Sequence, residues 1–416
     1  MIKILSGKCN DNNNTREEIN MVKKQSSKDI MLAHSAAKIE YYQKYLSRYL
    51  SIMSVARSIE EVNIFDVFCG RGIYADGGLG SPIRTVQTVK EVRENHPSDK
   101  RFNLYFNDAE NSFVKQVKKY INEHYPDNKD FCNIMYLCAP AETLFDKLCG
   151  FLPKTGFGTK NFLFVDPYGY KDINKQTFQQ LMCNQNTEML LFLPISFMHR
   201  FTHYAFNEDA NNGALRLRAF IEQFFPTDHK IRSEEPMDVK EYIDALSEAL
   251  SFNGKYYTSS YFIERDSRNY FALFSICNNL LGLEKAIETK WSLDEEDGQG
   301  FHLPDKTMQM NLFAEMFKEE NRKEHFEELK NMLFSFLTER GRTNDEIYRF
   351  ILRKGYLPKH VNAILRHLQD QKLIKVTLLD SGNEARKGSF YINYDASKDI
   401  KHPKVLIELK NENNKD

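Results

Sequence analysis

The hydrophobic positions of this chain fall into short, nearly continuous apolar runs that alternate with segments of helical spacing. A helix is predicted first, over residues 29–59, because apolar side chains recur there every three or four positions. Five strand-like runs follow, with helical patterns between them, at residues 63–68, 102–106, 133–137, 161–165 and 188–193. Apolar strands separated by helices are typical of a parallel sheet covered on both faces. The pattern therefore predicts a doubly wound α/β domain.

Two further strand-like runs, 255–263 and 270–276, are joined by a short polar turn and therefore predict an antiparallel hairpin. Five parallel strands closed by such a hairpin resemble the Rossmann-like sheet of class I methyltransferases, and this is the fold that we expect over residues 29–295. Between the fifth run and the hairpin, residues 195–253 are too many for one crossover helix. They predict a helical insertion at the edge of the active site, either a substrate lid or an elaboration of the packing.

The C-terminal part has a different pattern. An acidic, glycine-containing segment near residues 294–300 indicates a domain boundary, and residues 296–324 are expected to form a linker with one helix. Three helical patterns and two strand-like runs, 374–379 and 389–394, then predict a winged-helix domain over residues 325–396. Residues 1–28 are expected to be a loose N-terminal segment, and residues 397–416 a charged tail.

Composition narrows the class of protein. The 416 residues carry a formal net charge of −1, so any nucleic-acid surface must be local. No apolar run reaches the roughly 18–20 residues of a membrane span, and no signal-peptide pattern is visible, so we expect a cytoplasmic protein. The seven cysteines lack the close pairing of a zinc site, and we predict no metal.

The strongest local motif is the segment Phe65-Asp66-Val67-Phe68-Cys69-Gly70-Arg71-Gly72-Ile73-Tyr74, in which a strand ends in a glycine-rich turn. Glycines at this place let the backbone approach a ligand closely. The alternative is a tight turn with a purely structural role. The residues that we predict to bind a cofactor here are Asp66, Phe68, Gly70, Gly72 and Tyr74.

Two later strand ends supply further candidates. Asp108 ends the second strand, where a carboxylate can bind ribose hydroxyls; otherwise it is a strand-end cap. It follows Asp66 by about forty residues instead of the roughly twenty of a dinucleotide site, so NAD is not the expected ligand. Glu142, after the third strand, is either an adenine contact or a simple helix start. With the methyltransferase-like fold, these positions predict S-adenosyl-L-methionine as the cofactor.

The fourth strand ends in Asp166-Pro167-Tyr168-Gly169, at the edge of the sheet where open α/β folds bind ligands. It resembles the Asp/Asn-Pro-Pro-aromatic motif of amino-directed nucleic-acid methyltransferases, with tyrosine in place of the second proline. The Asp-Pro-aromatic-Gly form is similar to that of the tRNA guanine N2-dimethylating enzymes. A carboxylate there accepts from the exocyclic amine, and the aromatic ring stacks on the extruded base. We predict Asp166, Pro167 and Tyr168 as catalytic, the alternative being a strand-to-helix turn without catalysis.

Other residues are candidates for contact with the substrate. His34 and Lys38 lie four apart on the first helix, where they either reach a phosphate or form a solvated surface. A second glycine-rich loop brings Gly80, Ser81 and Pro82 beside the expected pocket. In the winged helix, Lys359 and Arg366 on the third helix suit phosphate contact, although winged helices also bind proteins.

Taken together, these motifs resemble the bacterial three-Cys-motif partner (TcmP) family over about 260 residues. The matching segments are His34-Ser35-Ala36-Ala37-Lys38, Phe65 to Gly72, Gly80-Ser81-Pro82, Phe106-Asn107-Asp108, Val165 to Gly169, Gly282-Leu283-Glu284 and Trp291. Cys69 departs from the family, whose members more usually have alanine there. The resemblance implies a methyltransferase fold and a separate three-Cys-motif protein that looks like a radical-SAM enzyme. It also implies a bacterial setting, often a mobile element or phage defence.

Two functions follow as hypotheses. The first is a SAM-dependent methyltransferase that acts on an exocyclic amine of a DNA or RNA base. The second is a non-catalytic nucleic-acid-binding scaffold for the three-Cys-motif partner enzyme. The missing second proline of the Asp166 motif keeps the scaffold hypothesis open. A nuclease is disfavoured, because no metal-carboxylate cluster is evident in the sequence.

Overall fold

The computed structural model describes residues 30–207, 210–232, 237–294, 298, 300–302 and 314–410, without the side chains of residues 314–324. The chain divides into two compact units. The first comprises residues 1–278 with 301–303, and the second residues 279–300 with 304–416. The predicted loose segment, 1–28, lies outside the described residues. Among the helices that are described, each is too short or too polar to span a lipid bilayer.

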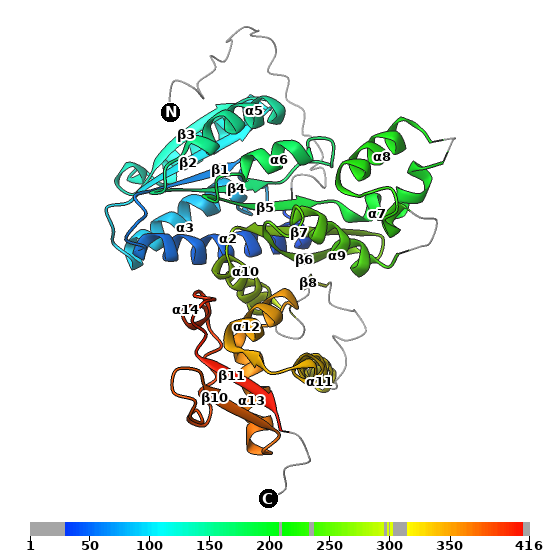
Figure 1. Ribbon diagram of the computed structural model, residues 1–416. Helices are drawn as coiled ribbons and strands as arrows, with labels where there is room; N and C mark the ends of the chain where they lie inside the picture. Colours follow the sequence, from blue (N-terminus) through cyan, green and yellow to red (C-terminus); the bar gives the residue numbers. More distant parts are fainter. Residues whose placement is uncertain are drawn as a thin grey trace, which may run out of the picture. The chain divides into compact units, whose positions relative to one another are not determined.

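The first unit is built on one sheet with the strand order β3-β2-β1-β4-β5-β7-β6-β8 (Figure 1). Five strands run parallel: β1 (Glu61–Asp66), β2 (Arg101–Asp108), β3 (Asn133–Cys138), β4 (Thr159–Val165) and β5 (Thr187–Leu193). The hairpin of β6 (Tyr257–Asp266) and β7 (Asn269–Cys277) is antiparallel, and β7 pairs with β5. The two-residue strand β8 (Gly300–Phe301) lies at the edge. This topology confirms the predicted class I methyltransferase-like fold.

Helices cover both faces of the sheet, as the nearly continuous apolar strands require. On one face, α2 (Ala33–Val55) packs Tyr42 and Tyr45 against Phe162 of β4, and α3 (Ser81–Asn95) lies beside α2. Alternate strand residues, such as Phe65 and Leu163, point to the other face and share a core with α5 (Ala141–Phe151) and α6 (Lys175–Leu181). The helix α4 (Asn111–His124) contacts β2 and β3.

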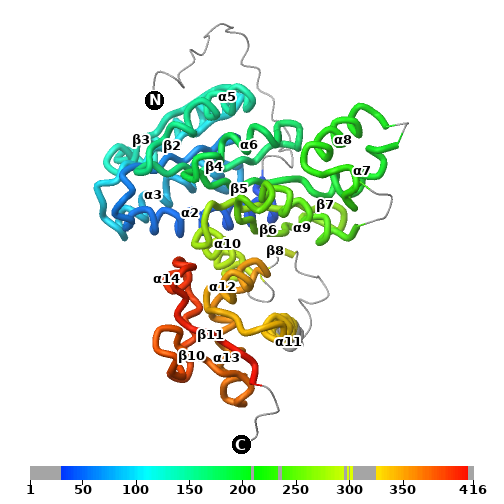
Figure 2. Tube along the Cα trace, viewed as in Figure 1, coloured from blue at the N-terminus to red at the C-terminus, as the bar shows by residue number. Residues whose placement is uncertain are grey.

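The insertion predicted between the fifth strand and the hairpin is helical. It contains α7 (Ile195–Ala205), α8 (Asn212–Phe224) and α9 (Val239–Leu250), and α9 packs on β6 (Figure 2). These helices bury their apolar faces in the same core as α5 and α6. The insertion is therefore an integral part of the first unit and not a loosely attached loop.

A row of asparagines crosses four parallel strands inside the sheet. Asn133 donates to Asn103 (2.9 Å), Asn103 to Asn63 (2.9 Å) and Asn63 to Asn161 (3.0 Å). Neighbouring members of the row are also register partners in the strand pairing. Because buried amides need hydrogen-bond partners, a one-residue slip of any of these strands would leave amides unpaired. The row therefore helps to fix the register of the sheet.

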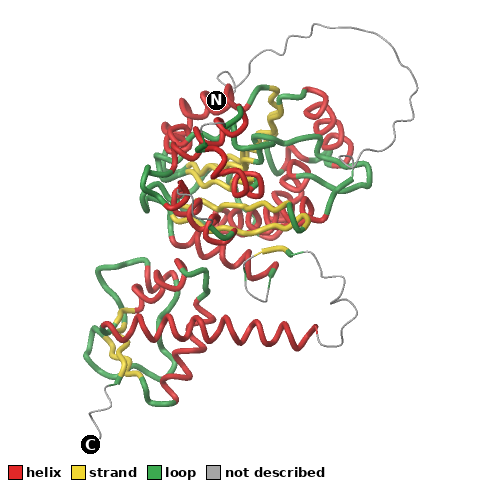
Figure 3. The backbone as a smooth tube through the Cα atoms, turned by 90° about the vertical axis from the view of Figure 1, so that its right-hand side faces the viewer, coloured by secondary structure: helices red, strands yellow, loops and turns green. Residues whose placement is uncertain are grey.

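The second unit contains the predicted winged helix, with α11 (Ala314–Glu339), α12 (Asn344–Arg353) and α13 (Pro358–Asp370). Figure 3 shows α11 as a single long helix, where the sequence predicted a connector and a separate helix. A three-stranded sheet of order β10-β11-β9 completes it, with β9 (Arg342–Thr343), β10 (Ile374–Leu378) and β11 (Val405–Leu409). A short helix, α14 (Tyr394–Ser397), precedes β11.

The wing corrects two predictions. The strand that pairs with β10 is β11, whereas residues 389–394 form no strand. Tyr391 has φ of 55°, which interrupts an extended run, although its neighbours Phe390 and Ile392 are buried. Residues 405–409 lie in the segment predicted as a charged tail, yet Val405 and Ile407 are completely buried. Their alternation with polar residues is the period-two signal of a half-buried strand.

The domain boundary also differs from the expected position at residue 295. The helix α10 (Leu280–Leu293) belongs to the second unit. The Trp291 indole donates a hydrogen bond to the Gly355 carbonyl oxygen (2.9 Å), and the Tyr348 hydroxyl donates to Glu284. These contacts tie α10 to the winged helix, and local sequence pattern gives no indication of such partners.

Candidate active site

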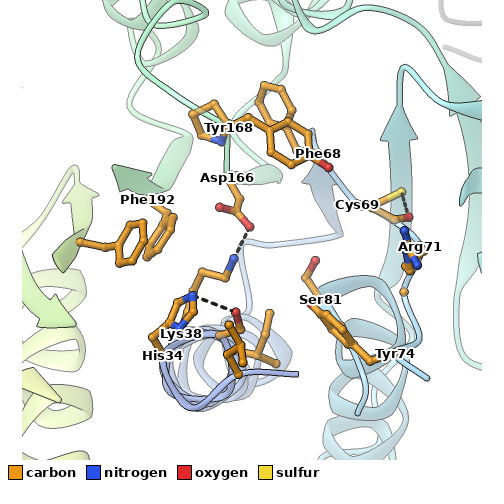
Figure 4. A pocket seen from close by; sticks show the side chains of 18 of the residues that line it. His34, Lys38, Phe68, Cys69, Arg71, Tyr74, Ser81, Asp166, Tyr168 and Phe192 are labelled. Atoms are coloured by element: carbon orange, nitrogen blue, oxygen red, sulfur yellow. Dashed lines mark hydrogen bonds and ion pairs between the residues drawn. The ribbon is translucent and has the colours of Figure 1, made fainter. Parts of the chain in front are cut away.

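A cavity of about 710 Å³ lies at the carboxyl ends of the parallel strands, between the first turns of α2 and the loop after β1 (Figure 4). Its size is within the range of small-molecule sites. Eleven of the residues singled out in the sequence line it: His34, Lys38, Phe68, Gly70, Gly72, Tyr74, Gly80, Ser81, Asp166, Pro167 and Tyr168. The structure thus brings together segments that are far apart along the chain.

The two glycines of the loop after β1 serve different purposes. Both have left-handed backbones, with φ of 59° at Gly70 and 73° at Gly72. A side chain at Gly72 would meet Val117 of α4 at 2.7 Å, so this glycine allows the loop to pack closely. A side chain at Gly70 would meet nothing within 4 Å. Gly70 therefore needs glycine for its conformation and leaves open space next to the cavity.

Asp66 lies beneath this loop and does not line the cavity itself. Its side chain is completely buried, and neither carboxylate oxygen has a hydrogen-bond partner among the described residues. Burial raises its pKa from the ordinary 3.8 to about 7. The Ser81 hydroxyl lies close enough to offset part of this rise in the pKa of Asp66. It forms no hydrogen bond of normal geometry with the Asp66 carboxylate, however. Such a carboxylate is suited to a cationic partner.

An ion pair that the sequence did not predict occupies the centre of the site. The Lys38 ammonium reaches from α2 to the Asp166 carboxylate at the end of β4, at 2.5 Å (Figure 4). Burial alone would lower the pKa of Lys38, but the attraction and hydrogen bond of Asp166 outweigh it and raise the pKa. Lys38 therefore stays charged and is committed to Asp166. This corrects the alternative that Lys38 forms a solvated surface, whereas its contact with a phosphate stays a prediction.

His34 differs from Lys38 in that it does not act as a cation. Its ring stacks on Phe271 of β7, with 5.3 Å between centroids and 7° between planes. Burial, with the charges of Arg265 and Lys38, lowers its pKa to about 4. His34 is therefore neutral near pH 7 and forms part of an aromatic wall.

That wall was missed by the sequence analysis. Phe271 stacks in turn on Phe192 of β5 (5.0 Å), and the Lys38 ammonium lies 4.6 Å from the centre of the Phe192 ring. Both phenylalanines line the cavity. In the sequence they look like ordinary strand residues, and only the position of Phe192 next to the end of its strand could have suggested a site residue.

Tyr168 has the most accessible aromatic ring of the site. Its side chain is 86% exposed and lines the mouth of the cavity, beside Phe68 in Figure 4. Pro167, which precedes it, is buried and also lines the cavity. A rigid proline followed by an exposed ring leaves the face of Tyr168 free to stack on a planar ligand.

Besides Asp66, three predicted residues of the first unit do not line the cavity. The Asp108 carboxylate accepts from the backbone N–H groups of Gly70 (3.0 Å) and Glu110 (2.8 Å), so it braces the glycine-rich loop as a strand-end cap. Glu142 is exposed in the first turn of α5, where it complements the helix dipole. Pro82 is buried in the first turn of α3 and packs near Gly72. Contact of Asp108 or Glu142 with a cofactor stays a prediction.

In the second unit, Lys359 and Arg366 lie on the exposed face of α13, with His367 beside Arg366. Arg386 and Lys387 of the wing are exposed as well. The predicted basic surface is thus accessible on this unit, as phosphate contact would require.

The strand order, the antiparallel hairpin and a cavity below a glycine-rich loop together define a methyltransferase-like α/β protein that carries a winged-helix unit. The family model described as the GMT-like wHTH domain matches residues 304–381, which confirms the winged helix. Among curated proteins, none matches the chain.

Solved structures similar to this chain include several methyltransferases. The O-methyltransferase TomG from Streptomyces achromogenes, in complex with SAM, is 13% identical, covers 62% of this chain and 92% of its own, and has a TM-score of 0.30. The O-methyltransferase from Bacillus cereus, in complex with SAH, is 9% identical, covers 59% and 84%, and has a TM-score of 0.32. The N-terminal domain of human METTL16, in complex with SAH, is 9% identical, covers 58% and 70%, and has a TM-score of 0.28. At such scores the similarity carries no argument about cofactor or substrate.

Proposed function

We propose that this protein transfers a methyl group from S-adenosyl-L-methionine to an exocyclic amine of a base in nucleic acid. The observation that carries the proposal is the Asp166 carboxylate, which pairs with Lys38 at the cavity, two residues from the exposed ring of Tyr168. A carboxylate acceptor next to a free aromatic face is what an amine on a planar base requires.

The residues beneath the cavity fit the cofactor. S-Adenosyl-L-methionine carries an ammonium group, and the buried, unpaired carboxylate of Asp66 would gain from a cation. The left-handed turn at Gly70 leaves open space through which a ligand can approach the backbone. When bound, the cofactor supplies a methyl group on a positively charged sulfur.

The chain's own residues can position the amine. One oxygen of Asp166 is held by Lys38, and its other oxygen is available to accept an N–H of the amine. That hydrogen bond would direct the nitrogen lone pair toward the methyl group, while Tyr168 stacks on the base. Asp166 or water would accept the proton that the amine loses when it is methylated. The neutral His34 and its aromatic wall would exclude water from one side.

The winged helix supports a nucleic-acid substrate, because Lys359 and Arg366 are exposed on its third helix. The resemblance to the three-Cys-motif partner family adds a second part to the proposal. In that setting, a separate three-Cys-motif protein would act on the same nucleic acid, and its iron–sulfur chemistry would belong to that partner.

The test compares Asp166→Ala with the double variant Lys38→Met/Asp166→Ala. The single change leaves Lys38 buried without its partner, and the double change removes that complication. We expect both to lose transfer of labelled methyl groups to DNA or RNA while calorimetry still detects the cofactor. Asp172→Ala, in the loop after the same strand, serves as the matched control and should keep both properties. Transfer retained by the double variant would rule out the role of Asp166.

The scaffold hypothesis remains the second candidate, since one oxygen of Asp166 is already engaged by Lys38. It expects the unaltered chain to bind oligonucleotides without binding S-adenosyl-L-methionine or S-adenosylhomocysteine. Micromolar cofactor binding followed by turnover would eliminate it.

A further inference from the structure

We propose that the α7–α8 insertion binds the unpaired strand on either side of the methylated base, by stacking and by contacts to phosphate. This inference rests on the proposed function, because it names the form of nucleic acid that the same site would accept: a single strand of DNA or RNA.

A row of aromatic side chains extends from the cavity onto α7. Tyr168 lines the cavity, and Tyr170, in the same loop, stacks on Phe197 with 6.1 Å between ring centres and 21° between planes. Phe197 in turn contacts Phe201 (4.7 Å). The Tyr170 hydroxyl donates to the Gly213 carbonyl oxygen (3.2 Å) and so joins the loop to the start of α8. The row on α7 is therefore joined to the loop that carries Tyr168, two residues from this cavity-lining ring.

The two rings on α7, Phe197 and Phe201, are not part of the core of the insertion. The buried face of α7 consists of other residues: Ile195, Ser196, Met198, Thr202 and Ala205. Phe197 and Phe201 lie on the opposite face and are 39% and 40% exposed. Large exposed aromatics that gather beside a cavity indicate a binding surface.

Cationic side chains accompany the row. Arg200 is exposed on the same face of α7 as Phe197 and Phe201, and Lys171 follows Tyr170 directly. Arg216 is exposed one turn into α8. Among the described residues, no carboxylate forms an ion pair with Lys171, Arg200 or Arg216.

Two other arginines of the insertion provide a contrast. Arg218 and Arg232 share the Glu222 carboxylate, which offsets part of their positive charge. Accessible aromatic rings interleaved with unpaired cations are what proteins use to bind single strands, because every base has a stacking face and every nucleotide carries a phosphate. A protein partner would use the rings but would not explain cations that pair with no carboxylate among the described residues.

The experiment measures binding of fluorescent single-stranded oligonucleotides, dT12 and rU12, to the full chain by anisotropy. Phe197→Ala/Phe201→Ala should weaken binding by about tenfold or more, since each base loses a stacking partner. Arg200→Ala/Arg216→Ala should reduce the slope of log affinity against log salt by about 1.4, at about 0.7 for each phosphate contact. Comparing dT12 with rU12 shows whether DNA or RNA is preferred.

Phe157→Ala is the matched control. Phe157 resembles the test residues in being exposed (87%) and in having a cation nearby, since the Lys160 ammonium lies 6.0 Å from the centre of its ring. It precedes β4, however, and so lies at the edge of the sheet away from the cavity. This control should leave the affinity unchanged. The inference would be overturned if the Phe197→Ala/Phe201→Ala variant bound the oligonucleotides with unchanged affinity. It would also be overturned if this variant lost only its association with other copies of the chain.

Failure of the inference and failure of the proposed function give different results. If the aromatic variant loses single-strand binding but the unaltered chain never transfers a methyl group, the inference stands and the proposed function fails. If the unaltered chain methylates oligonucleotides and the aromatic variant does so with the same KM, the inference fails and the proposed function stands.

Discussion

Replacing Asp66 with asparagine should stabilise the cofactor-free protein at pH 8 and at the same time weaken cofactor binding. Asp66 is completely buried, and its carboxylate has no hydrogen-bond partner among the described residues. Asparagine has the same shape and no charge. The change therefore removes the cost of burying an ion while it also removes the proposed partner of the cofactor ammonium.

The magnitude follows from the pKa of Asp66, which burial raises from 3.8 to about 7. Between these two values the folded state holds a proton that the unfolded state has lost, so the free energy of unfolding falls as pH rises from about 4 to 7. At about 1.4 kcal/mol for each tenfold change, the loss amounts to roughly 4 kcal/mol and is fully developed by pH 8. The buried amide of the variant offsets about 1–3 kcal/mol of the gain.

The assay is urea unfolding of both proteins between pH 4 and pH 8. The free energy of unfolding of Asp66→Asn relative to the unaltered protein should rise by roughly 4 kcal/mol over this range. Burial also raises the pKa of Glu188 to about 7, but this group is present in both proteins and cancels in the difference. A difference that does not change with pH would refute the reasoning.

Glu188→Gln is the matched control for cofactor binding. Glu188 is also buried but accepts a hydrogen bond from Tyr45, and it lies at the start of β5, away from the carboxyl ends of the strands where Asp66 lies. By calorimetry, Asp66→Asn should weaken binding of S-adenosyl-L-methionine about tenfold or more, the worth of a hydrogen bond to a charged group. Glu188→Gln should leave that affinity unchanged, and an equal loss in both variants would show that Asp66 has no specific role.

Two further predictions concern stability. Lys38→Met should lower the free energy of unfolding by roughly 3 kcal/mol, because it leaves Asp166 without its partner. A double-mutant cycle by urea unfolding should give a coupling energy above about 1 kcal/mol between Lys38 and Asp166. Simple additivity of the two changes would contradict the ion pair. Asn103→Leu should cost about 2–4 kcal/mol, because it leaves the side-chain oxygen of Asn63 and the side-chain N–H of Asn133 without their partner. Asn133→Leu at the exposed end of the row should cost less in the same assay, and the opposite order would contradict the proposed role of the row.

Much of the first unit could be predicted because its signals are local. Each apolar run is long enough to mark a strand, and a polar turn marks the hairpin. The carboxyl ends of parallel strands meet at one edge of a sheet, so residues that follow two different strands, such as Gly70 and Asp166, could be assigned to one site from their positions alone. The basic face of α13 was equally visible, since helical spacing determines which residues share a face.

The errors came where local pattern was ambiguous. Residues 389–394 contain alternating apolar positions, yet the left-handed backbone at Tyr391 breaks the strand, and β11 takes its place. The helix α10 has an ordinary helical pattern, and only its hydrogen bonds to Tyr348 and Gly355 assign it to the winged-helix unit.

For the first unit, the sequence by itself determined the alternation of strands and helices, the parallel sheet with its hairpin, and the two strand-end loops that line the cavity. The tertiary structure alone decided the chemistry of the site. It paired Lys38 with Asp166 across 128 positions of the chain and placed His34 against Phe271. It also buried the Asp66 carboxylate without a hydrogen-bond partner among the residues that the structure describes. Such contacts join residues that are distant in sequence, so no periodic pattern records them. Their effects on charge depend on burial, which exists only after the chain has folded.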